Sequence, residues 1–439
     1  MATNLDRRRL LKLGALAAVG AATGGSLTAC GSGAGAGDGV AELSMWTFLD
    51  PAGTDPRGKA LKEIVDGFNA SQSAAKVTVT SMNYAKIDGE VIRAANTGGG
   101  PDIVNIYTPQ LAQHVEGGSV QEIDEYAAEW LSQAGSDYLF PIDSAKVDGK
   151  LMALPWESRV WLLWYRKDIL DAYKVKPPTT VEEAIATGAA IRKASGGKVT
   201  GFAVGLSEQS LGADFMEKFD PFTAAYGGEI IGADGKATFA SQAGEQAMAL
   251  IKKAADAGAM GREVLTMGAD EVVNGVKAGT VAMAIEGSYR VATTRAAEGV
   301  GDNLVTLPVP GIAAGKNMPT AVAGQTLAMG ANTGHPEQVW AFMRYYLSAE
   351  SQAKFAAAGV LPVLKSVYDS DAVSKAENAA ELLQWRDYLA TDGKVSRFPA
   401  DYSELSTNLV KAAQNIIFNG AAIPATLNDA QTQYNQNRK

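Results

Sequence analysis

Two hydrophobic periods alternate through residues 43–107 of this 439-residue chain. Short apolar or alternating runs, typical of strands, are separated by longer segments whose apolar residues recur at helical spacing. The predicted strands are LSMWTF (43–48), VTVT (77–80) and DIVNIY (102–107), and the predicted helices span 59–69 and 84–96. The order strand, helix, strand, helix, strand predicts parallel pairing with right-handed crossovers.

The middle of the chain repeats this alternation. The apolar run VWLLWY predicts a buried strand, and Thr180 with Glu183 has the spacing of a capping box that opens a helix reaching Ser195. The last quarter is mostly helical, with two amphipathic stripes. The predicted elements are strands at 160–165, 201–206 (GFAVGL), 281–285, 304–309 and 325–330, a helix at 243–259, and helical stripes at 339–347 and 405–416.

The first 29 residues have a different pattern. Arg7, Arg8, Arg9 and Lys12 form a basic region, and residues 13–29 are uncharged and rich in Ala, Gly and Leu. This layout predicts a secretory signal peptide. A transmembrane helix is disfavoured because the apolar stretch is short and interrupted by glycines.

Two finer motifs lie within this signal. Residues 7–12, RRRLLK, resemble the twin-arginine export signal, but Asp6 stands where Ser or Thr is commoner, so the general secretory route stays open. Leu-Thr-Ala-Cys, ending at Cys30, resembles the bacterial lipobox, and Cys30 is the only cysteine of the chain. We therefore expect a lipid on Cys30, a flexible tether over 30–41, and a location on the outer face of the bacterial cell membrane.

Composition narrows the range of functions. The chain carries a net charge of −9, and the signal contributes +3, so the remainder carries −12. An acidic surface argues against a nucleic-acid partner. The two histidines, His114 and His335, leave little for a transition-metal site. No cofactor or metal is expected.

Four phrases resemble the extracellular solute-binding proteins of ABC importers, in the sugar-binding family that includes maltose-binding protein. They appear in the family's order behind the lipobox, and the resemblance covers essentially all of 43–436. The phrases are GPDIVNIY (100–107), GKLMALPWESRVWLLWYRKDIL (149–170), KAGTVAMAIEGSYR (277–290) and AGQTLAMGANTGHPEQVWAFMRYYLSAESQAKF (323–355).

The resemblance implies an α/β, two-lobed periplasmic-binding-protein fold, or Venus flytrap, with a hinge of crossing strands. Lobe 1 would comprise 42–157 plus 323–361, and lobe 2 would comprise 158–322 plus 362–439. The expected crossings lie near 156–160, 321–324 and 361–365. The family is not catalytic, so we expect a monomeric binding protein whose partners are a sugar or oligosaccharide, ABC permease subunits and, through the lipid, the membrane.

Candidate ligand residues follow from strand ends and from the resemblance. Sugars bind to aromatic faces and planar polar groups, and ligands of α/β sheets bind at the carboxyl ends of strands. Trp46 could instead be a core residue, and Asp50 could instead belong to a turn. Glu157 and Arg159 could instead form a salt bridge within the hinge. The candidates are Trp46, Asp50, Tyr107, Thr108, Gln110, Glu157, Arg159, Asp214, Asp220, Tyr289, Gly324, Gln325 and Tyr402.

Other functions remain open at this point. The same fold could bind an acidic sugar, an organic anion or a polyamine, and Arg159 with Arg290 would suit an anion. An exported carbohydrate-active hydrolase would need two carboxylates about 5–10 Å apart, for which Glu157 and Asp50 are the imaginable pair. No catalytic motif supports that pair.

The lipobox interpretation predicts that Cys30→Ser releases the protein from the membrane fraction, because the acyl chains need the thiol for attachment. Fractionation of cells followed by immunoblotting measures the change. Ser32→Ala, which leaves Cys30 in place, is the matched control. Retention of Cys30→Ser in washed membranes would contradict the interpretation.

Overall fold

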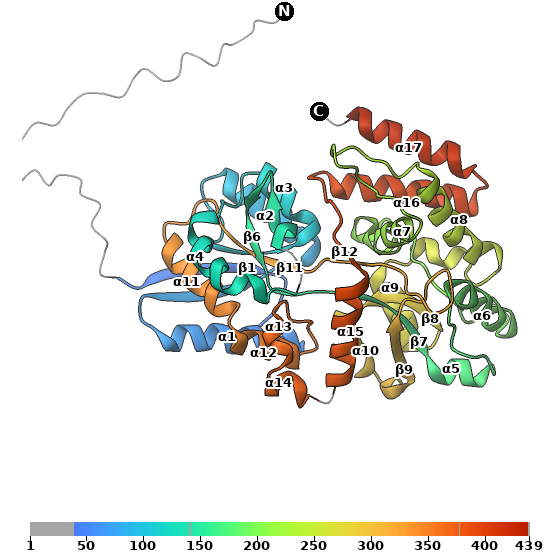
Figure 1. Cartoon of the computed structure of the whole chain (residues 1–439), viewed down its shortest axis with the longest axis horizontal. Helices are drawn as coiled ribbons and strands as arrows, with labels where there is room; N and C mark the ends of the chain where they lie inside the picture. Colours follow the sequence, from blue (N-terminus) through green and yellow to red (C-terminus); the bar gives the residue numbers. More distant parts are fainter. Residues whose placement is uncertain (1–38, 140–141, 377, 438–439) are drawn as a thin grey trace, which may run out of the picture. The chain divides into compact units, whose positions relative to one another are not determined.

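The structure is a computed structural model that describes residues 39–139, 142–376 and 378–437. Residues 40–439 form one compact unit, in which helices surround two main sheets (Figure 1). The predicted signal peptide and Cys30 lie outside the described residues. In the ranges that are described, no helix has both the length and the apolar character needed to cross a membrane.

The first sheet has five strands in the order β2-β1-β3-β11-β6. β1 pairs in parallel with β2 and β3, which confirms the prediction, whereas β11 runs antiparallel to β3 and β6. The chain therefore returns to this sheet after building the second one. The strands are β1 (Ala41–Thr47), β2 (Ala75–Ser81), β3 (Ile103–Tyr107), β6 (Ala153–Pro155) and β11 (Gln325–Met329).

The helices of the first lobe follow local sequence signals. α1 begins at Pro56, where a missing N–H costs nothing, and the Asp55 side chain caps it by accepting from the Arg57 N–H. Its apolar face, including Leu61 and Ile64, is buried as the stripe predicts. The helices are α1 (Pro56–Ser71), α2 (Tyr84–Asn96), α3 (Leu111–Glu116), α4 (Asp124–Ala134), α11 (Pro336–Tyr346), α12 (Ala349–Ala357), α13 (Lys365–Tyr368) and α14 (Asp371–Ser374). α13 and α14 fall in the range 362–439 that the predicted boundaries give to lobe 2, but both contact α12 of the first lobe.

The second sheet has the strand order β8-β7-β9, with β8 and β9 antiparallel to β7. This antiparallel sheet differs from the parallel one that the alternation of strands and helices in the middle of the chain suggested. The prediction of a strand at GFAVGL is also wrong. The amide N–H groups of Gly201 and Phe202 both donate to the Ala259 carbonyl, so only isolated parallel bridges at Thr200 and Ala203 remain. The strands are β7 (Trp161–Arg166), β8 (Met283–Gly287) and β9 (Leu304–Pro308).

The helices that flank the second sheet include the two C-terminal ones. In Figure 1, α16 and α17 lie beside α7 and α8, which they contact. Thr180 caps α6 as predicted, by accepting from the Glu183 N–H. The helices are α5 (Lys167–Ala172), α6 (Val181–Ala194), α7 (Ala213–Ala225), α8 (Gln242–Asp256), α9 (Ala269–Ala278), α10 (Val291–Arg295), α15 (Ala379–Asp392), α16 (Tyr402–Phe418) and α17 (Ile423–Asn437).

The central strand β7 contributes to two hydrophobic cores. Trp161, Leu163 and Tyr165 pack into the core of the second lobe, whereas Leu162 and Trp164 join a cluster continuous with the core of the first lobe. Successive side chains of a strand point to opposite faces, which explains why all six residues of this strand are buried. The cluster that holds Leu162 and Trp164 also includes apolar residues of α15.

The three predicted crossings hydrogen-bond to one another and form the hinge. The Ser158 N–H donates to the Leu361 carbonyl and the Arg159 N–H to the Ala323 carbonyl, both at 2.9 Å. A two-stranded parallel pair adds to this array: β10 (Thr320–Ala321), at the start of the second crossing, pairs with β12 (Gly393–Lys394). The crossing segments therefore form a small bonded array between the two sheets.

Gly324 is the tightest point of this array. A Cβ at this position would lie 1.8 Å from the Glu157 carbonyl oxygen. Real Cβ atoms do not approach a backbone atom so closely, so any side chain here would push the first and second crossings apart. A glycine is needed for close backbone approach rather than for an unusual dihedral angle.

We therefore expect Gly324→Ala to lower the free energy of unfolding by about 2 kcal/mol or more, the range of strained buried substitutions. Gly334→Ala is the matched control, because Gly334 is exposed and a Cβ there meets nothing within 4 Å. Urea melts of the two variants make the comparison. Equal stability of Gly324→Ala and the wild type would show that the crossings separate freely.

Candidate functional site

A cavity of about 330 Å³ lies between the two lobes. Its volume falls at the lower end of the range of small-molecule sites. It is lined by Phe48, Asp55, Arg57, Tyr84 and Tyr107 of the first lobe, by Arg159 of the hinge, and by Ala213, Asp214, Glu217, Ala269, Asp270, Tyr289, Arg290 and Thr293 of the second lobe.

Strand ends deliver the aromatic residues of this cavity. Phe48 follows β1, Tyr84 follows β2 and opens α2, and Tyr107 ends β3. These strands are parallel, so their carboxyl ends meet at one edge of the sheet, where α/β folds bind ligands. Tyr289 lies in the 3₁₀ helix Ser288–Arg290 directly after β8. Both lobes therefore present aromatic rings to the same space.

Arg159 is the charged centre of the lining. Its guanidinium is buried and pairs with the carboxylate of Glu157, so the hinge salt bridge that stood as the structural alternative for these two residues is present. It also lies 4.0 Å from the ring centroid of Tyr289 and 5.2 Å from that of Tyr107, a cation–π arrangement. Burial is the largest influence and works against the charged form, but the Glu157 carboxylate together with the Tyr289 and Tyr84 hydroxyls outweighs it and raises the pKa of Arg159 above its usual value. One face of the Tyr289 ring is thus covered by the protein itself.

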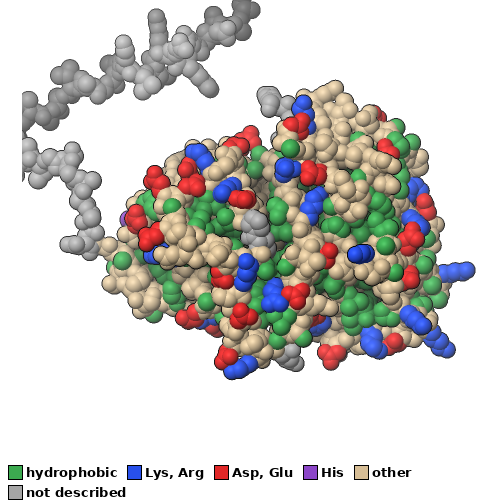
Figure 2. All heavy atoms as spheres, viewed as in Figure 1, with side chains coloured by type: hydrophobic (Ala, Val, Ile, Leu, Met, Phe, Trp, Pro, Cys, Tyr) green, Lys and Arg blue, Asp and Glu red, His purple; other side chains and the backbone are tan. Residues whose placement is uncertain are grey.

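The other two arginines of the lining also have carboxylate partners. Arg57 contacts Asp55 at 2.8 Å, and Arg290 pairs with Asp270 while its Nε donates to the Tyr289 hydroxyl at 3.0 Å. The Nη1 group of Arg57 is buried and has no hydrogen-bond partner in the described ranges. On the face seen in Figure 2, charged side chains of both signs are interspersed at the surface. The pairs of the cavity differ from those because their residues line a space between the two lobes.

Glu217 of α7 completes the lining. Its Oε2 accepts a hydrogen bond of 2.8 Å from the indole N–H of Trp161, and its Oε1 lies 3.5 Å from the Tyr107 hydroxyl. Burial raises the pKa of Glu217 above its usual value, although the nearby Lys218 acts in the opposite direction. Glu217 is therefore a hydrogen-bond acceptor held in place by an indole.

A buried charge cluster supports this part of α7. Lys218 is 1% exposed; it pairs with Asp214, one turn earlier, and lies 3.6 Å from Glu286 of β8. The other oxygen of Asp214 accepts from the Gly205 N–H. Burial raises the pKa of Glu286 well above its usual value, with Lys218 opposing. The cluster ties the start of α7 to the second sheet and so fixes the direction of Glu217.

Phenolic hydroxyls surround Glu217 and Arg159. Burial raises the pKa values of Tyr107 and Tyr402, and the Glu217 carboxylate adds to the effect in each. These two hydroxyls therefore stay protonated at any physiological pH. Of the two residues, Tyr107 lines the cavity, where its hydroxyl can donate or accept a hydrogen bond.

Four of the predicted residues line the cavity: Tyr107, Arg159, Asp214 and Tyr289. Glu157 stands behind Arg159 as its partner. Thr108 donates through its N–H and its hydroxyl to the Gly324 carbonyl, both at 3.0 Å, and so joins β3 to the second crossing. Gln110 lies 3.4 Å from Ser403 of α16, a contact across the lobes.

Trp46 and Asp50 lie elsewhere. Trp46 packs against the core of the first lobe, and Asp50 is exposed and accepts from the Ala52 N–H in a turn. Both positions match the structural alternatives stated for them. Gln325 is 1% exposed, and neither atom of its amide has a partner among the residues that the structure describes.

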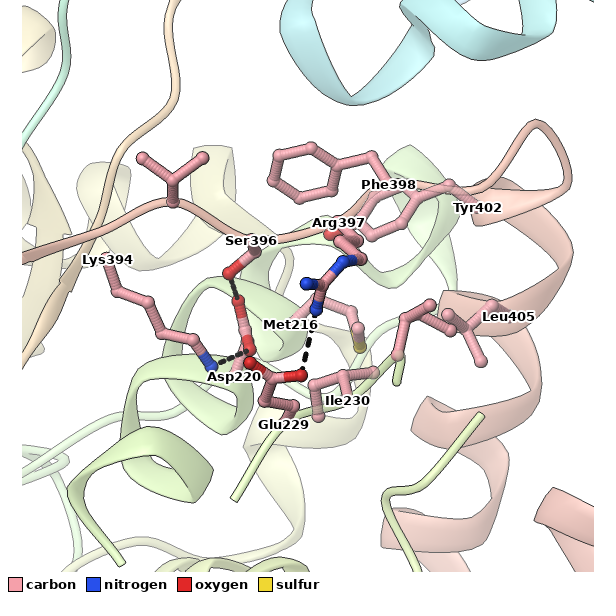
Figure 3. Close-up of a pocket in the computed structure, with 12 residues that line it drawn as sticks. Met216, Asp220, Glu229, Ile230, Lys394, Ser396, Arg397, Phe398, Tyr402 and Leu405 are labelled. Carbon is pink, nitrogen blue, oxygen red and sulfur yellow. Dashed lines mark hydrogen bonds and ion pairs between the residues drawn. The ribbon is translucent and has the colours of Figure 1, made fainter. Parts of the chain in front are cut away.

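Asp220 and Tyr402 border a second, much smaller pocket, shown in Figure 3. There Asp220 accepts from Ser396 and lies 3.3 Å from the Lys394 ammonium, while Tyr402 meets Phe398 edge to face at 5.3 Å. The pocket holds about 20 Å³, space for a water molecule but not for a sugar. These contacts fasten the segment after β12 to α7.

Phe48, Tyr84, Asp55, Arg57 and Glu217 were not predicted from the sequence. The rule of strand ends would have found Phe48, the last residue of the predicted strand 43–48, and Tyr84, which comes shortly after the predicted strand 77–80. Glu217 lies between Asp214 and Asp220, which were chosen from the resemblance, but only the helix phase brings it to the cavity. In the parts of the chain that are described, no three His, Cys, Asp or Glu side chains gather as a metal site would require.

Comparisons with known proteins agree with this architecture. A protein of Brucella abortus (strain 2308), named as a binding protein, is 24% identical over 385 residues, which are 85% of this chain and 88% of that protein. A Deinococcus radiodurans protein, named as an ABC transporter-binding protein, is 28% identical over 54% of this chain and 56% of its own length. The maltose-bound MalE3 of T. maritima superposes with a TM-score of 0.74 at 17% identity, covering 90% of this chain and 99% of that one.

The T. maritima protein shares the fold of this chain, and the other two proteins match it in sequence at 24% and 28% identity. The family model of bacterial extracellular solute-binding proteins matches residues 63–381, which include both main sheets apart from β1 and all the crossings up to 365. The chain therefore belongs to the bacterial extracellular solute-binding proteins.

Proposed function

We propose that this protein captures a sugar or oligosaccharide in the cavity between its lobes and delivers it to an ABC importer. The observation that carries the proposal is the lining itself, in which four aromatic rings and several fixed polar groups from both lobes face one space. Aromatic faces match the C–H faces of sugar rings, and carboxylate, guanidinium and phenol groups match the hydroxyls. The maltose bound to the T. maritima protein of the same fold supports a sugar as the ligand class.

The hinge supports a capture mechanism by lobe closure. A ligand in this cavity would contact Tyr84 and Tyr107 of one lobe and Glu217 and Tyr289 of the other. Such a ligand binds best when the lobes are together, so it shifts the population toward the closed state. The crossing segments are the element ends at which the backbone change would be absorbed.

The place of action follows from the N-terminal motifs. The proposed lipid on Cys30 would hold the protein at the outer face of the cell membrane, with the glycine-rich tether between the membrane and the lobes. Delivery to an ABC permease is supported by the name of the D. radiodurans relative. Lipid anchoring would keep the captured solute near the permease.

The hydrolase alternative finds little support in the cavity. Asp50 is not among the lining residues, and Glu157 faces Arg159 rather than the open space. The test of the proposal is isothermal titration calorimetry with a panel of mono- and oligosaccharides, together with chromatography of the same mixtures after long incubation. Binding without cleavage supports capture, whereas cleavage of a bound sugar would favour the hydrolase. If no sugar bound, a sugar ligand would be refuted.

The Tyr289 ring forms a wall of the cavity and holds the Arg159 guanidinium, so its removal should weaken sugar binding. We expect Tyr289→Ala to raise Kd roughly ten- to a hundredfold, at about 1.4 kcal/mol per decade. Tyr289→Trp keeps an aromatic face and should bind much more tightly than the alanine variant. Calorimetry with the sugar found in the panel makes the measurement.

Tyr173→Ala is the control, because Tyr173 is also half-buried in the second lobe but lies outside the lining. A melting temperature of ligand-free Tyr289→Ala close to that of the wild type is also expected. A large drop in that temperature would assign Tyr289 to the core instead.

A further inference from the structure

The charged side chains of the cavity lining differ in whether an oppositely charged side chain pairs with them. Each of the three arginines already has a carboxylate of its own: Arg57 has Asp55, Arg159 has Glu157 and Arg290 has Asp270. Asp214 is likewise paired with Lys218. An anionic ligand would therefore meet guanidinium groups whose charge a protein carboxylate already offsets.

Glu217 is the exception. Its two contacts are with neutral donors, the Trp161 indole at 2.8 Å and the Tyr107 hydroxyl at 3.5 Å. Among the residues that the structure describes, no lysine, arginine or histidine forms an ion pair with it, since Lys218 is directed to Asp214 and Glu286, and Arg290 to Asp270. The lining therefore contains one carboxylate whose charge no direct partner balances.

The position of Glu217 lets its unpaired negative charge act on a ligand in the cavity. Glu217 lies in a cavity bordered by tyrosine hydroxyls and rings and is partly shielded from solvent, so that charges interact more strongly there than in bulk water. A carboxylate on a ligand would be repelled there. A ligand ammonium would meet both the carboxylate and the electron-rich ring faces that favour cations.

We propose that Glu217 is a specificity-determining residue that selects ligands by charge. The cavity would prefer a sugar with a protonated amino group to the matched neutral sugar, and would bind the matched uronic acid least. This inference rests on the proposed sugar-binding function. It excludes acidic sugars, which the arginines alone would have favoured.

The test compares matched probes on the full chain without its signal. The probes are glucose, glucosamine and glucuronate, with galactose, galactosamine and galacturonate as a second set, titrated by calorimetry at pH 7 and low salt. For the wild type we expect the uronate of a set to bind at least about tenfold more weakly than its neutral sugar, and the amine severalfold more tightly.

Variants assign the effect to this residue. Glu217→Gln keeps an acceptor for the Trp161 indole but removes the charge, so it should bring the three affinities within about threefold of one another. Glu217→Asp keeps the charge and should preserve the ranking. Glu182→Gln removes an exposed carboxylate of the same lobe, paired only with Lys253, and should change nothing. Thermal melts establish that each variant is folded.

The outcomes separate this inference from the function on which it rests. Binding of the sugars with no ranking by charge, a ranking that favours the uronates, or a ranking that survives in Glu217→Gln would each overturn the role of Glu217 while leaving sugar capture intact. If neither these six probes nor the wider saccharide panel bound, sugar capture would be refuted, and this inference with it. If Glu217→Gln does not fold, the wild-type and Glu217→Asp rankings still decide between selection and its absence.

Discussion

The ion pair between Glu157 and Arg159 connects the hinge of this protein with its cavity. Both residues lie in the first crossing, whose backbone is bonded to the second and third crossings. The guanidinium emerges from the hinge between the rings of Tyr107 and Tyr289, one from each lobe. A buried cation of this kind is tolerable only with its carboxylate in place. The hinge geometry and the shape of the cavity are thus set by the same two side chains.

The rest of the site follows from how neighbouring charges are satisfied. Buried carboxylates and cations pair within short loops or single helical turns, as Arg57 does with Asp55 and Lys218 with Asp214. These local pairs fix side chains before any ligand arrives, which reduces the ordering cost of binding. Among the residues that the structure describes, what remains in the lining without an ion-pair partner is a set of neutral phenols and the carboxylate of Glu217.

Hydrophobic periodicity predicted four of the five strands of the first sheet and the helices α1, α2, α6, α8, α11 and α16 closely, because each of these elements buries one clear face. It failed at GFAVGL, where the backbone N–H groups of Gly201 and Phe202 turn to the Ala259 carbonyl rather than to a strand, a choice that side-chain pattern does not encode. The antiparallel second sheet was missed for a similar reason: β7 is apolar on both faces whichever way its neighbours run. The site was predicted in part, since strand ends mark where a ligand lies, but the partner of each charge depends on helix phase and on contacts between distant segments.

The two faces of β7 bear on how the molecule folds. Leu162 and Trp164 belong to the cluster that extends into the first lobe, and α15 covers this side of the second sheet with its own apolar residues. A second lobe excised at the crossings would leave that side of its central strand without part of its cover. The lobes of this protein therefore share one continuous hydrophobic cluster, and α15, which contributes to it, is synthesised more than two hundred residues after β7.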